Sequence, residues 1–391
     1  MSDFRMEPFW SAPPEQCDVV IIGAGLIGTA IALHLAQRGV QVAVLERFQI
    51  ASGASGRNDG QIILETADYY QRMKQVYGDR SAFGVLDLKR RGQMDLHTYL
   101  TDKSYPELAY HRAGSLTLAV NDQEARTIES AITEMAKDGF HTEHVNCDQI
   151  EAKIGTRAFT MGKWDPLDAT VNPAELTRLF AAQARKAGAR IVENCPVTQL
   201  DRQAVHHAYG KTECEIVILA TNAYSSSLEP NLAKLIFPVR GQVMATEPSD
   251  LRFEPIGCIT NFGYDYWHWT VDGRLILGGK RPTDEHVEVG TEEWVNPKVQ
   301  AALDAFKAET YPQAEHLKVV KRWSGIMGFS ADGLPLIGPL GGDPTLWVAA
   351  GFTGYGLGMS WSVGKAVADV LSGDQTPWAD QLKIFNPGRF S

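Results

Sequence analysis

Near the start of the chain, the hydrophobic and polar positions predict a strand, a turn, a helix and a second strand. Residues 18–22 form a short run rich in β-branched side chains, which is typical of a buried parallel strand. A glycine-rich turn, GAGLIG, follows at residues 23–28. We expect a helix over about 26–37, which Gly39 ends, and a second strand over 41–45. This order of elements indicates an α/β sheet.

Further elements are expected along the rest of the chain. The pattern predicts helices over residues 68–100, 122–137, 173–186 and 359–371. It predicts strands over residues 116–120, 189–193, 215–220, 237–246, 264–269, 274–278 and 346–350. Asn172 and Pro173 begin a helix, because asparagine caps the first turn and proline is tolerated at the first helical position. The strands at 189–193 and 215–220 resemble a continuation of the first sheet, which predicts a discontinuous first domain.

The composition is that of an ordinary globular protein. The chain has 391 residues, 44% hydrophobic and 21% charged, and this length allows two domains with sizeable cores. The net charge of −10 argues against a nucleic-acid partner, because phosphate binding needs a basic surface. The pattern predicts no transmembrane helix, no signal peptide and no metal site. Five scattered cysteines without a CxxC pair are typical of reduced thiols, so we expect a cytoplasmic protein.

The first glycine turn is a candidate site for the phosphates of a dinucleotide. Gly23 permits the tight turn, Gly25 lets a pyrophosphate approach the backbone, and Gly28 lets the helix pack closely on the strand. The helix directs unpaired N–H groups and its positive dipole end toward the phosphates. Glu46, about twenty residues later, can accept both hydroxyl groups of a ribose and would repel a 2′-phosphate, which excludes NADP. FAD and NAD remain alternatives, because both are held in this way.

Two further loops are candidates for ligand contact. The loop ASGASGRNDGQ at residues 51–61 is polar and glycine-rich, so it suits a phosphate or the edge of a flavin, or it is a flexible surface loop. A second glycine turn, GFTGYGLG, lies at residues 351–358 between a predicted strand and a predicted helix. Two such turns far apart in one chain suggest a single long ligand held at both ends.

The strand predicted at 264–269 is unusually aromatic. Alternation places Tyr264, Tyr266 and His268 on one face of this strand. It places Trp267 and Trp269 on the other face, together with Asp265. The tyrosine face would form a box for an amine substrate over a flat cofactor, or it would simply pack in the core.

Taken together, these motifs resemble the FAD-dependent amino-acid and amine oxidoreductases of the D-amino-acid oxidase superfamily. The resemblance covers nearly the whole chain. It rests on GAGLIG with Glu46, ASGASGRNDGQ, RWSG at 322–325, DGLPLIGP at 332–339, and GFTGYGLG. The PFWSAPP leader at residues 8–14 and the GRNxGQ form of the loop are most similar to the gamma-glutamylputrescine oxidoreductase-like branch.

The resemblance implies an α/β protein with a Rossmann-like FAD-binding domain and an α+β substrate domain that contains a large antiparallel sheet. This is the architecture of glycine oxidase and sarcosine oxidase. The FAD-binding domain would be formed by residues 1–84, 150–228 and 326–391. The substrate domain would be formed by residues 85–149 and 229–325.

The resemblance also implies which residues contact FAD. The pyrophosphate and the adenosine ribose would be held by Gly23, Ala24, Gly25, Leu26, Ile27, Gly28, Glu46 and Arg47. The diphosphate, the ribityl chain and the flavin would be lined by Ser52, Ala54, Ser55, Gly56, Arg57, Asn58, Gly60 and Gln61. Val197 would meet the adenine end, and Thr221 would lie near the diphosphate. The flavin ring would meet Gly351, Phe352, Thr353, Gly354, Tyr355 and Gly356.

Several positions depart from the family pattern. Met327 stands where amino-acid-using relatives have an arginine that clamps the substrate carboxylate, which favours an amine substrate. Gly325 stands where sarcosine-oxidase-type enzymes attach the flavin to a cysteine, so FAD should be non-covalent. Ile276 stands where those oxidases use a lysine to activate oxygen, with Lys280 close by in sequence, and this leaves oxidase and dehydrogenase open. Asp59 replaces an expected glycine; its side chain either places a charge near the flavin or faces solvent, and we favour solvent.

The predicted reaction is oxidation of a C–N bond, in which a hydride passes from the α-carbon of a neutral amine to flavin N5 and the imine then hydrolyses. Tyr264, Tyr266 and Met327 are the candidate substrate contacts. His268 and Lys280 are the candidate catalytic residues. One alternative is an oxidase or dehydrogenase of D- or N-methyl-amino acids, in which Arg240 or Lys280 replaces the missing arginine. Another is a flavin-binding subunit without turnover.

Overall fold

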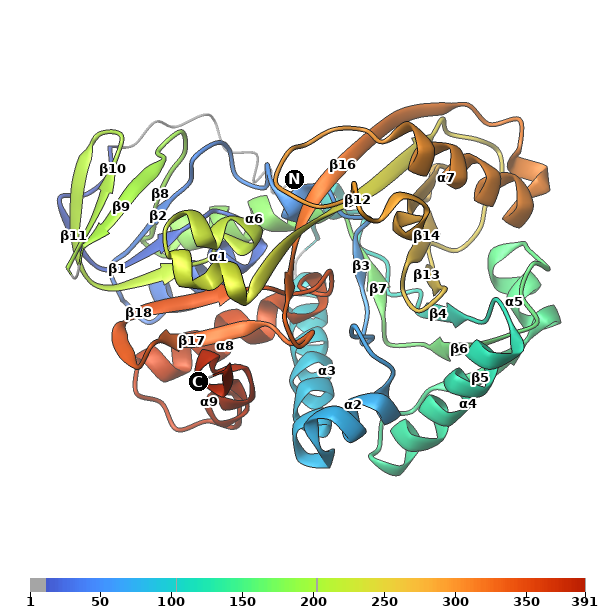
Figure 1. The fold of residues 1–391 in the computed structure, drawn as a ribbon, viewed down its shortest axis with the longest axis horizontal. Coiled ribbons are helices and arrows are strands. Elements are labelled where there is room, and N and C mark those ends of the chain that lie inside the picture. Colours follow the sequence, from blue (N-terminus) through green and yellow to red (C-terminus); the bar gives the residue numbers. More distant parts are fainter. Residues whose placement is uncertain (1–11, 103, 202, 391) are drawn as a thin grey trace.

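The computed structural model describes residues 12–102, 104–201 and 203–390, and these form two large sheets side by side (Figure 1). Residues 8–11 of the predicted leader lie outside this described part. The first sheet, sheet A, has the strand order β17-β18-β11-β1-β2-β8, with β10 and β9 continuing from β11. Its strands are β1 (Gln16–Ile22), β2 (Val42–Leu45), β8 (Arg190–Val192), β9 (Val197–Asp201), β10 (Ala204–His207), β11 (Gly210–Leu219), β17 (Leu336–Leu340) and β18 (Asp343–Ala350).

The centre of sheet A is parallel and is covered by helices. The strands β1, β2, β8, β11 and β18 pair in parallel, whereas β17 pairs antiparallel with β18. Val19 and Ile21 of β1 face one cluster with the covering helices, and Val20 and Ile22 face a second cluster on the other side. Both faces are therefore buried, which explains the continuous apolar runs in the sequence. The covering helices are α1 (Leu26–Ala36), α6 (Pro173–Lys186) and α8 (Ser360–Leu371).

The second sheet, sheet C, is mainly antiparallel and has the strand order β16-β12-β15-β14-β13-β4-β6-β5. Only the β13–β4 pair is parallel among the described strands of this sheet. Its strands are β4 (Ser115–Leu118), β5 (Glu143–Asn146), β6 (Met161–Asp165), β12 (Ile236–Thr246), β13 (Gly257–Thr260), β14 (Asp265–Trp269), β15 (Leu275–Gly279) and β16 (Val319–Ser330). A short pair, β3 (Gln61–Ile62) with β7 (Ala169–Thr170), lies between the sheets (Figure 1).

The remaining helices connect and cover the two sheets. They are α2 (Tyr70–Tyr77), α3 (Asp79–Thr101), α4 (Asp122–Lys137), α5 (Cys147–Ile154), α7 (Pro297–Thr310) and α9 (Pro377–Leu382). The single helix predicted over 68–100 is wrong, because the chain breaks at Gly78, whose φ of 81° is not helical, and forms α2 and α3. Of the described helices, each is too short or too polar to cross a membrane.

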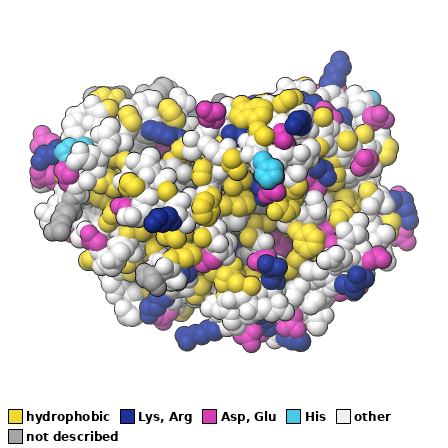
Figure 2. All heavy atoms as spheres, in the orientation of Figure 1, with side chains coloured by type: hydrophobic (Ala, Val, Ile, Leu, Met, Phe, Trp, Pro, Cys, Tyr) yellow, Lys and Arg dark blue, Asp and Glu magenta, His cyan; other side chains and the backbone are white. Residues whose placement is uncertain are grey.

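The predicted fold class, an α/β protein with a large antiparallel sheet, is confirmed. The division into domains stays a prediction. Several elements do not follow its boundaries: β6, predicted in the first domain, pairs with β4 and β5 of sheet C, and α3, which the predicted boundary divides after residue 84, packs against α8. Figure 2 shows hydrophobic side chains gathered across the hollowed middle of one face, with most charged side chains at its edges.

Candidate active site

A large cavity of about 1690 Å³ lies between the two sheets. One end is lined by the carboxyl ends of the parallel strands of sheet A, through Ile22, Leu45 and Ala349. The other is lined by sheet C, through Tyr266 on β14 and Met327 on β16. Ligands of open α/β sheets bind beyond the carboxyl ends of the strands, and this cavity occupies that place.

The first glycine turn borders the cavity in a conformation that requires its glycines. Gly23 has a φ of 106°, and a Cβ there would lie 2.9 Å from the carbonyl oxygen of Ala220. A Cβ at Gly28 would lie 2.1 Å from the carbonyl oxygen of Gly23, so the helix approaches the turn as closely as predicted. Gly25 lines the cavity, and its Cβ would lie 3.0 Å from Ser55 Oγ. Ala24 and Gly28 face the protein and do not belong to the cavity lining of the described residues.

Glu46 joins the end of β2 to the glycine turn. Its carboxylate accepts hydrogen bonds from the backbone N–H of Ala24 at 2.8 Å and of Phe48 at 2.9 Å. Burial raises the pKa of this carboxyl, against the lowering effect of the two N–H donors. Glu46 and Arg47 both line the cavity. Each carboxylate oxygen accepts one protein hydrogen bond here, which leaves acceptor capacity for a ligand hydroxyl.

The loop at 51–61 forms one wall of the cavity and is not a flexible surface loop. Its predicted contacts that line the cavity are Ser52, Ala54, Ser55, Arg57, Asn58 and Gln61. Gly56 and Gly60 serve packing instead, because a Cβ would lie 2.2 Å from the Ala51 carbonyl oxygen and 2.1 Å from that of Val171. The RWSG motif holds this loop, since Trp323 Nε1 donates to the Arg57 carbonyl at 2.9 Å.

The expectation that Asp59 faces solvent is wrong. Its side chain lines the cavity, and its carboxylate accepts a hydrogen bond from Gln61 Nε2. Burial raises the pKa of Asp59, and the charge of His268 lowers it. The loop turns inward between the sheets, so a position that looks like a polar surface residue in the sequence points toward the ligand space.

The predicted alternation of the aromatic strand is confirmed. Tyr264 and Tyr266 line the cavity together with Met327. On the opposite face, Trp267 and Trp269 are fully buried in the core of sheet C. The Tyr266 ring packs against Gly278 of β15, where a Cβ would lie 2.2 Å from its Cε2.

The second glycine turn closes the other side of the same cavity. Phe352, Thr353, Gly354, Tyr355 and Gly356 line it, as do Val197 and Thr221 near the sheet A end. Gly351 lies behind the lining, where its N–H donates to Asn222 Oδ1 at 3.0 Å. Thr353 has a φ of 51°, and its N–H donates to the Gly328 carbonyl at 2.9 Å.

The two glycine turns therefore face one cavity, and a model of the family called FAD dependent oxidoreductase matches residues 18–370. The chain belongs to this family. It is 30% identical to gamma-glutamylputrescine oxidoreductase of Escherichia coli strain K12 over 370 residues, which are 92% of this chain and 84% of that protein. It is 26% identical to glycine oxidase of Bacillus licheniformis, over 94% of this chain and 96% of that protein.

Solved structures share the fold of this FAD dependent oxidoreductase. L-proline dehydrogenase from P. horikoshii superposes with a TM-score of 0.83 at 23% identity and covers 97% of this chain and 98% of its own. Glycine oxidase from Geobacillus kaustophilus superposes with a TM-score of 0.79 at 23% identity and covers 93% of this chain and 96% of its own. These likenesses confirm the predicted architecture.

The residues of the cavity fit the family cofactor, FAD. The cavity is larger than the usual 300–1,000 Å³ of a small-ligand site, so it has room for a dinucleotide and a substrate. The Gly25 backbone is open to the cavity beside the first turn of α1, where the helix dipole favours a pyrophosphate. Among the described residues, which include all five cysteines, no cysteine lines the cavity.

The two predicted catalytic side chains do not reach the cavity lining of the described residues. His268 is 8% exposed, and its Nδ1 lies 3.1 Å from the Trp269 carbonyl oxygen. Lys280 Nζ lies 2.7 Å from Asp265 Oδ2 and 4.2 Å from the centroid of the Phe306 ring, on the core face of sheet C. The geometry gives neither residue a role toward a ligand.

Arg240 is also unsuited to replace the missing arginine. Three of its guanidinium nitrogens donate to the carbonyl oxygens of Glu292, Val287 and Val289. Sequence analysis missed Glu65 and Arg281, both of which line the cavity. Neither lies in a motif, and only the packing of sheet C against the loop brings them to the ligand space.

Proposed function

We propose that the protein oxidises a C–N bond of a small-molecule amine, and that the imine product then hydrolyses. The observation that carries this proposal is that Met327 lines the cavity beside Gly354, with its Sδ 3.7 Å from where a Gly354 Cβ would lie. The resemblance to amino-acid oxidoreductases implies an arginine at this position. Methionine has no charge and no donor with which to clamp a carboxylate. The similarity to gamma-glutamylputrescine oxidoreductase supports an amine substrate.

We propose that FAD extends along the cavity from Glu46 to the second glycine turn. Gly25 and the N-terminus of α1 would hold the pyrophosphate, and Glu46 the adenosine ribose. Val197 and Thr221 would lie at the adenosine and diphosphate end. The loop at 51–61 would line the middle of the cofactor. Residues 352–356 would meet the flavin ring, where the N-terminal end of the following helix favours negative charge.

When bound, FAD accepts the hydride that leaves the carbon next to the nitrogen. The residues of this chain bind and orient the amine for that transfer. Tyr264 and Tyr266 form an aromatic wall that orients the amine and favours a cationic nitrogen group. No side chain is required as a base if the amine enters deprotonated. Asp59 is one of the titratable carboxyls of the cavity lining, and burial raises its pKa.

The test is a panel of amines, D-amino acids and N-methyl-amino acids, followed by flavin absorbance without oxygen and by peroxide release and dye reduction in separate assays. The proposal expects amines to bleach the flavin and amino acids to do so far more slowly. Bleaching by amino acids alone would contradict it. The two assays with an acceptor also distinguish an oxidase from a dehydrogenase.

The variant Met327→Arg sharpens this test. A cation at this position should lower kcat/KM for amines by about 10-fold or more, because it puts an uncompensated charge against the apolar side of the substrate. It should also bring measurable turnover of an α-amino acid, because a hydrogen bond from a charged group to the carboxylate contributes about 1.5–3 kcal/mol. Met327→Leu keeps the volume and the apolar character, so it should retain amine turnover within about threefold. An unchanged amine preference in Met327→Arg would show that this position does not contact the substrate.

A second candidate function, oxidation of a D- or N-methyl-amino acid, is favoured by Arg281. This residue lines the cavity, and its guanidinium carbon lies 5.1 Å from the centroid of the Tyr264 ring. It is already paired with Glu285, at 2.9 Å. Binding a carboxylate would therefore require it to serve two anions. The same substrate panel distinguishes the two functions.

We also propose a cytoplasmic location. The support is that the five cysteines, all within the described residues, are free thiols. Fractionation of the native host into cytoplasm, membrane and secreted material, followed by immunodetection of the chain, tests this location.

A further inference from the structure

Glu65 puts a carboxylate into the cavity wall beyond the residues expected to hold FAD. It lies in the loop after β3, its side chain is 10% exposed, and it lines the cavity. Asp68, Tyr69 and Tyr355 line the cavity near it. None of the motifs that identify the family includes this residue, so its position needs a separate explanation.

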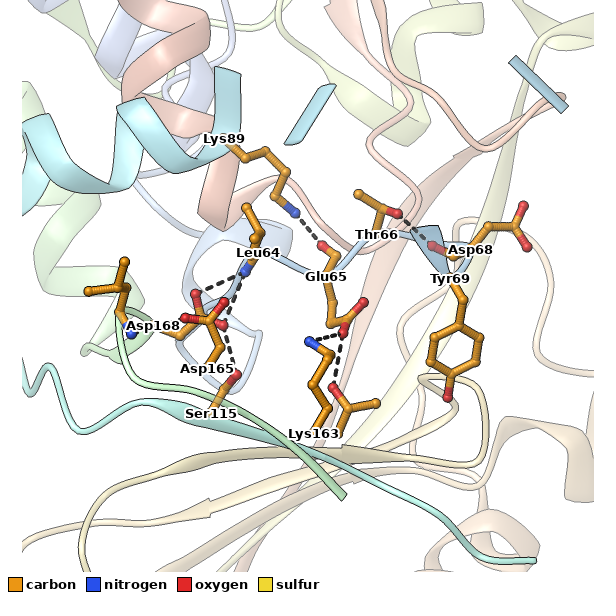
Figure 3. Close-up of polar contacts among 12 residues, drawn as sticks. Leu64, Glu65, Thr66, Asp68, Tyr69, Lys89, Ser115, Lys163, Asp165 and Asp168 are labelled. Atoms are coloured by element: carbon orange, nitrogen blue, oxygen red, sulfur yellow. Dashed lines mark hydrogen bonds and ion pairs between the residues drawn. The ribbon is translucent and has the colours of Figure 1, made fainter. Parts of the chain in front are cut away.

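One oxygen of this carboxylate is held firmly by sheet C. Lys163 Nζ lies 2.5 Å from Glu65 Oε1, and Thr117 Oγ1 donates to the same oxygen at 3.0 Å. Thr117 and Lys163 are paired residues on β4 and β6. From the other side, Lys89 Nζ donates to the backbone carbonyl of Glu65. Figure 3 shows Glu65 between Lys89 and Lys163, with its second carboxylate oxygen directed away from Lys163.

The charges behind Glu65 explain its orientation but not its exposure to the cavity. Lys163 is 1% exposed and needs a counter-charge, which Glu65 supplies. Arg90 forms ion pairs with Asp165 and with Asp168, the latter at 3.5 Å. Glu65 lines the cavity, and its second carboxylate oxygen, which is directed away from Lys163 (Figure 3), is the one available to a ligand.

The surroundings of this oxygen favour a cation. Burial raises the pKa of the Tyr355 hydroxyl, and the negative charges of Glu65, Asp68 and Asp59 raise it further, so three carboxylates act on this region. Asp68 is partly neutralised by Arg72, whose Nε lies 2.9 Å from it. The Lys89 ammonium already lies 5.5 Å from the centroid of the Tyr355 ring, and the Tyr69 ring adds a further aromatic face on which an ammonium group is stabilised.

We propose that Glu65 binds a second ammonium group of the substrate, at the end of the molecule away from the oxidised carbon. The substrate class is then amines with a distal cationic group, such as α,ω-diamines and their derivatives. This inference rests on the proposed function, which places the oxidised carbon near Tyr266 and Met327. Glu65 is accordingly a specificity-determining residue rather than a catalytic one.

The experiment measures binding separately from turnover. The FAD of the holoenzyme is reduced beforehand, so that bound amine is not oxidised, and affinities are measured by isothermal titration. The probes are α,ω-diamines of increasing length and amino alcohols of the same lengths, which differ only in the distal charge. The wild-type protein should bind the best diamine about 10- to 100-fold more tightly than its amino alcohol, as expected for a charge-assisted hydrogen bond.

In Glu65→Gln this preference should fall to about twofold or less, because the amide carries no charge, while amino alcohol affinity is retained. The variant leaves Lys163 without its counter-charge and risks misfolding. The double variant Glu65→Gln with Lys163→Met removes both charges, restores the balance and should lose the preference equally. Asp68→Asn is the matched control: it removes a neighbouring cavity charge that Arg72 partly compensates, so it should lower the preference far less than Glu65→Gln does.

Three outcomes would overturn the inference. These are equal affinities for diamine and amino alcohol in the wild-type protein, a preference that survives in the double variant, or an equal loss in Asp68→Asn, which would assign the effect to the general field of the cavity. Failure of the proposed function gives a different result, namely a flavin that no amine reduces. If no amine reduces the flavin, a diamine preference that disappears with Glu65 would identify an ammonium-binding residue but would contradict its role in substrate specificity.

Discussion

Gly28→Ala tests whether the close approach of α1 to the first glycine turn is essential. The added Cβ would lie 2.1 Å from the Gly23 carbonyl oxygen, whereas real Cβ atoms do not approach closer than about 3.0 Å. The neighbour is backbone and cannot rotate away, so the helix must move by almost 1 Å. Overpacking of this kind costs about 1–3 kcal/mol, and we take the upper end. Alanine returns about 1 kcal/mol of helix propensity, which leaves a net loss of about 2 kcal/mol.

The matched variant is Gly25→Ala, which adds the same methyl group to the same turn. Gly25 has a φ of −73°, which alanine adopts readily, and its Cβ would lie 3.0 Å from Ser55 Oγ, which accepts a hydrogen bond from the Leu26 N–H at 2.8 Å. We therefore expect the FAD-free protein to lose no more than about 1 kcal/mol of stability, the value of that hydrogen bond, but to bind FAD at least about 10-fold more weakly, because the methyl group occupies the approach of the pyrophosphate.

Urea unfolding of the FAD-free proteins measures the first quantity, and quenching of flavin fluorescence measures the second. Gly28→Ala should lower the free energy of unfolding by more than Gly25→Ala does, and Gly25→Ala should mainly lower the FAD affinity. The reasoning is refuted if Gly28→Ala unfolds at the wild-type urea concentration, or if both variants bind FAD like the wild-type protein.

Three further predictions follow from single residues. Glu46→Gln should weaken FAD binding about 10- to 100-fold in a fluorescence titration, because it removes a charged acceptor; unchanged affinity would remove Glu46 from the site. Trp267→Ala should lower the free energy of unfolding by about 3–5 kcal/mol, since the indole is fully buried and its Nε1 donates to Tyr311 Oη at 2.9 Å; a loss below about 1 kcal/mol in urea unfolding would contradict the packing. Burial lowers the pKa of Lys89 from its ordinary 10.5 to about 8. Between these pH values the unfolded chain binds more protons than the folded chain. The free energy of unfolding of the wild-type protein should therefore gain a contribution from Lys89 as the pH rises from about 8 to 10.5. Urea unfolding of Lys89→Met over the same pH range should lack this contribution, and an equal gain in both proteins would contradict the assignment.

The sequence predicted those parts of the site that depend on local rules. The roles of Gly23 and Gly28 follow from the sterics of one strand–turn–helix unit, and the structure has the close contacts that these roles require. The two faces of β14 follow from the two-residue period of a strand. The sequence therefore predicts correctly that Tyr266 and Trp267 lie on opposite faces, Tyr266 toward the cavity and Trp267 in the core of sheet C. The second glycine turn faces the same cavity for the same kind of reason.

The parts that sequence reasoning missed depend on packing between distant segments. Lys280 directly follows β15, close in sequence to the position where the resemblance implies an oxygen-activating lysine. Its ammonium group is paired with Asp265 of the neighbouring strand β14 and therefore lies on the core face of sheet C. Asp59 lies in a polar loop whose side chains line the cavity between the sheets. Glu65 is oriented by Lys163, about a hundred residues later in the chain. No local pattern contains these contacts, because each joins two separate segments of the chain.

The central claim is that this chain binds FAD between its two glycine turns and uses it to oxidise an amine. The most direct measurement is an anaerobic titration of the purified, FAD-loaded protein with the amine panel, followed by the visible absorbance of the flavin. The account predicts that at least one amine bleaches the flavin fully, with one equivalent of amine per flavin. A protein that does not retain FAD, or whose flavin stays oxidised with every amine, would contradict it.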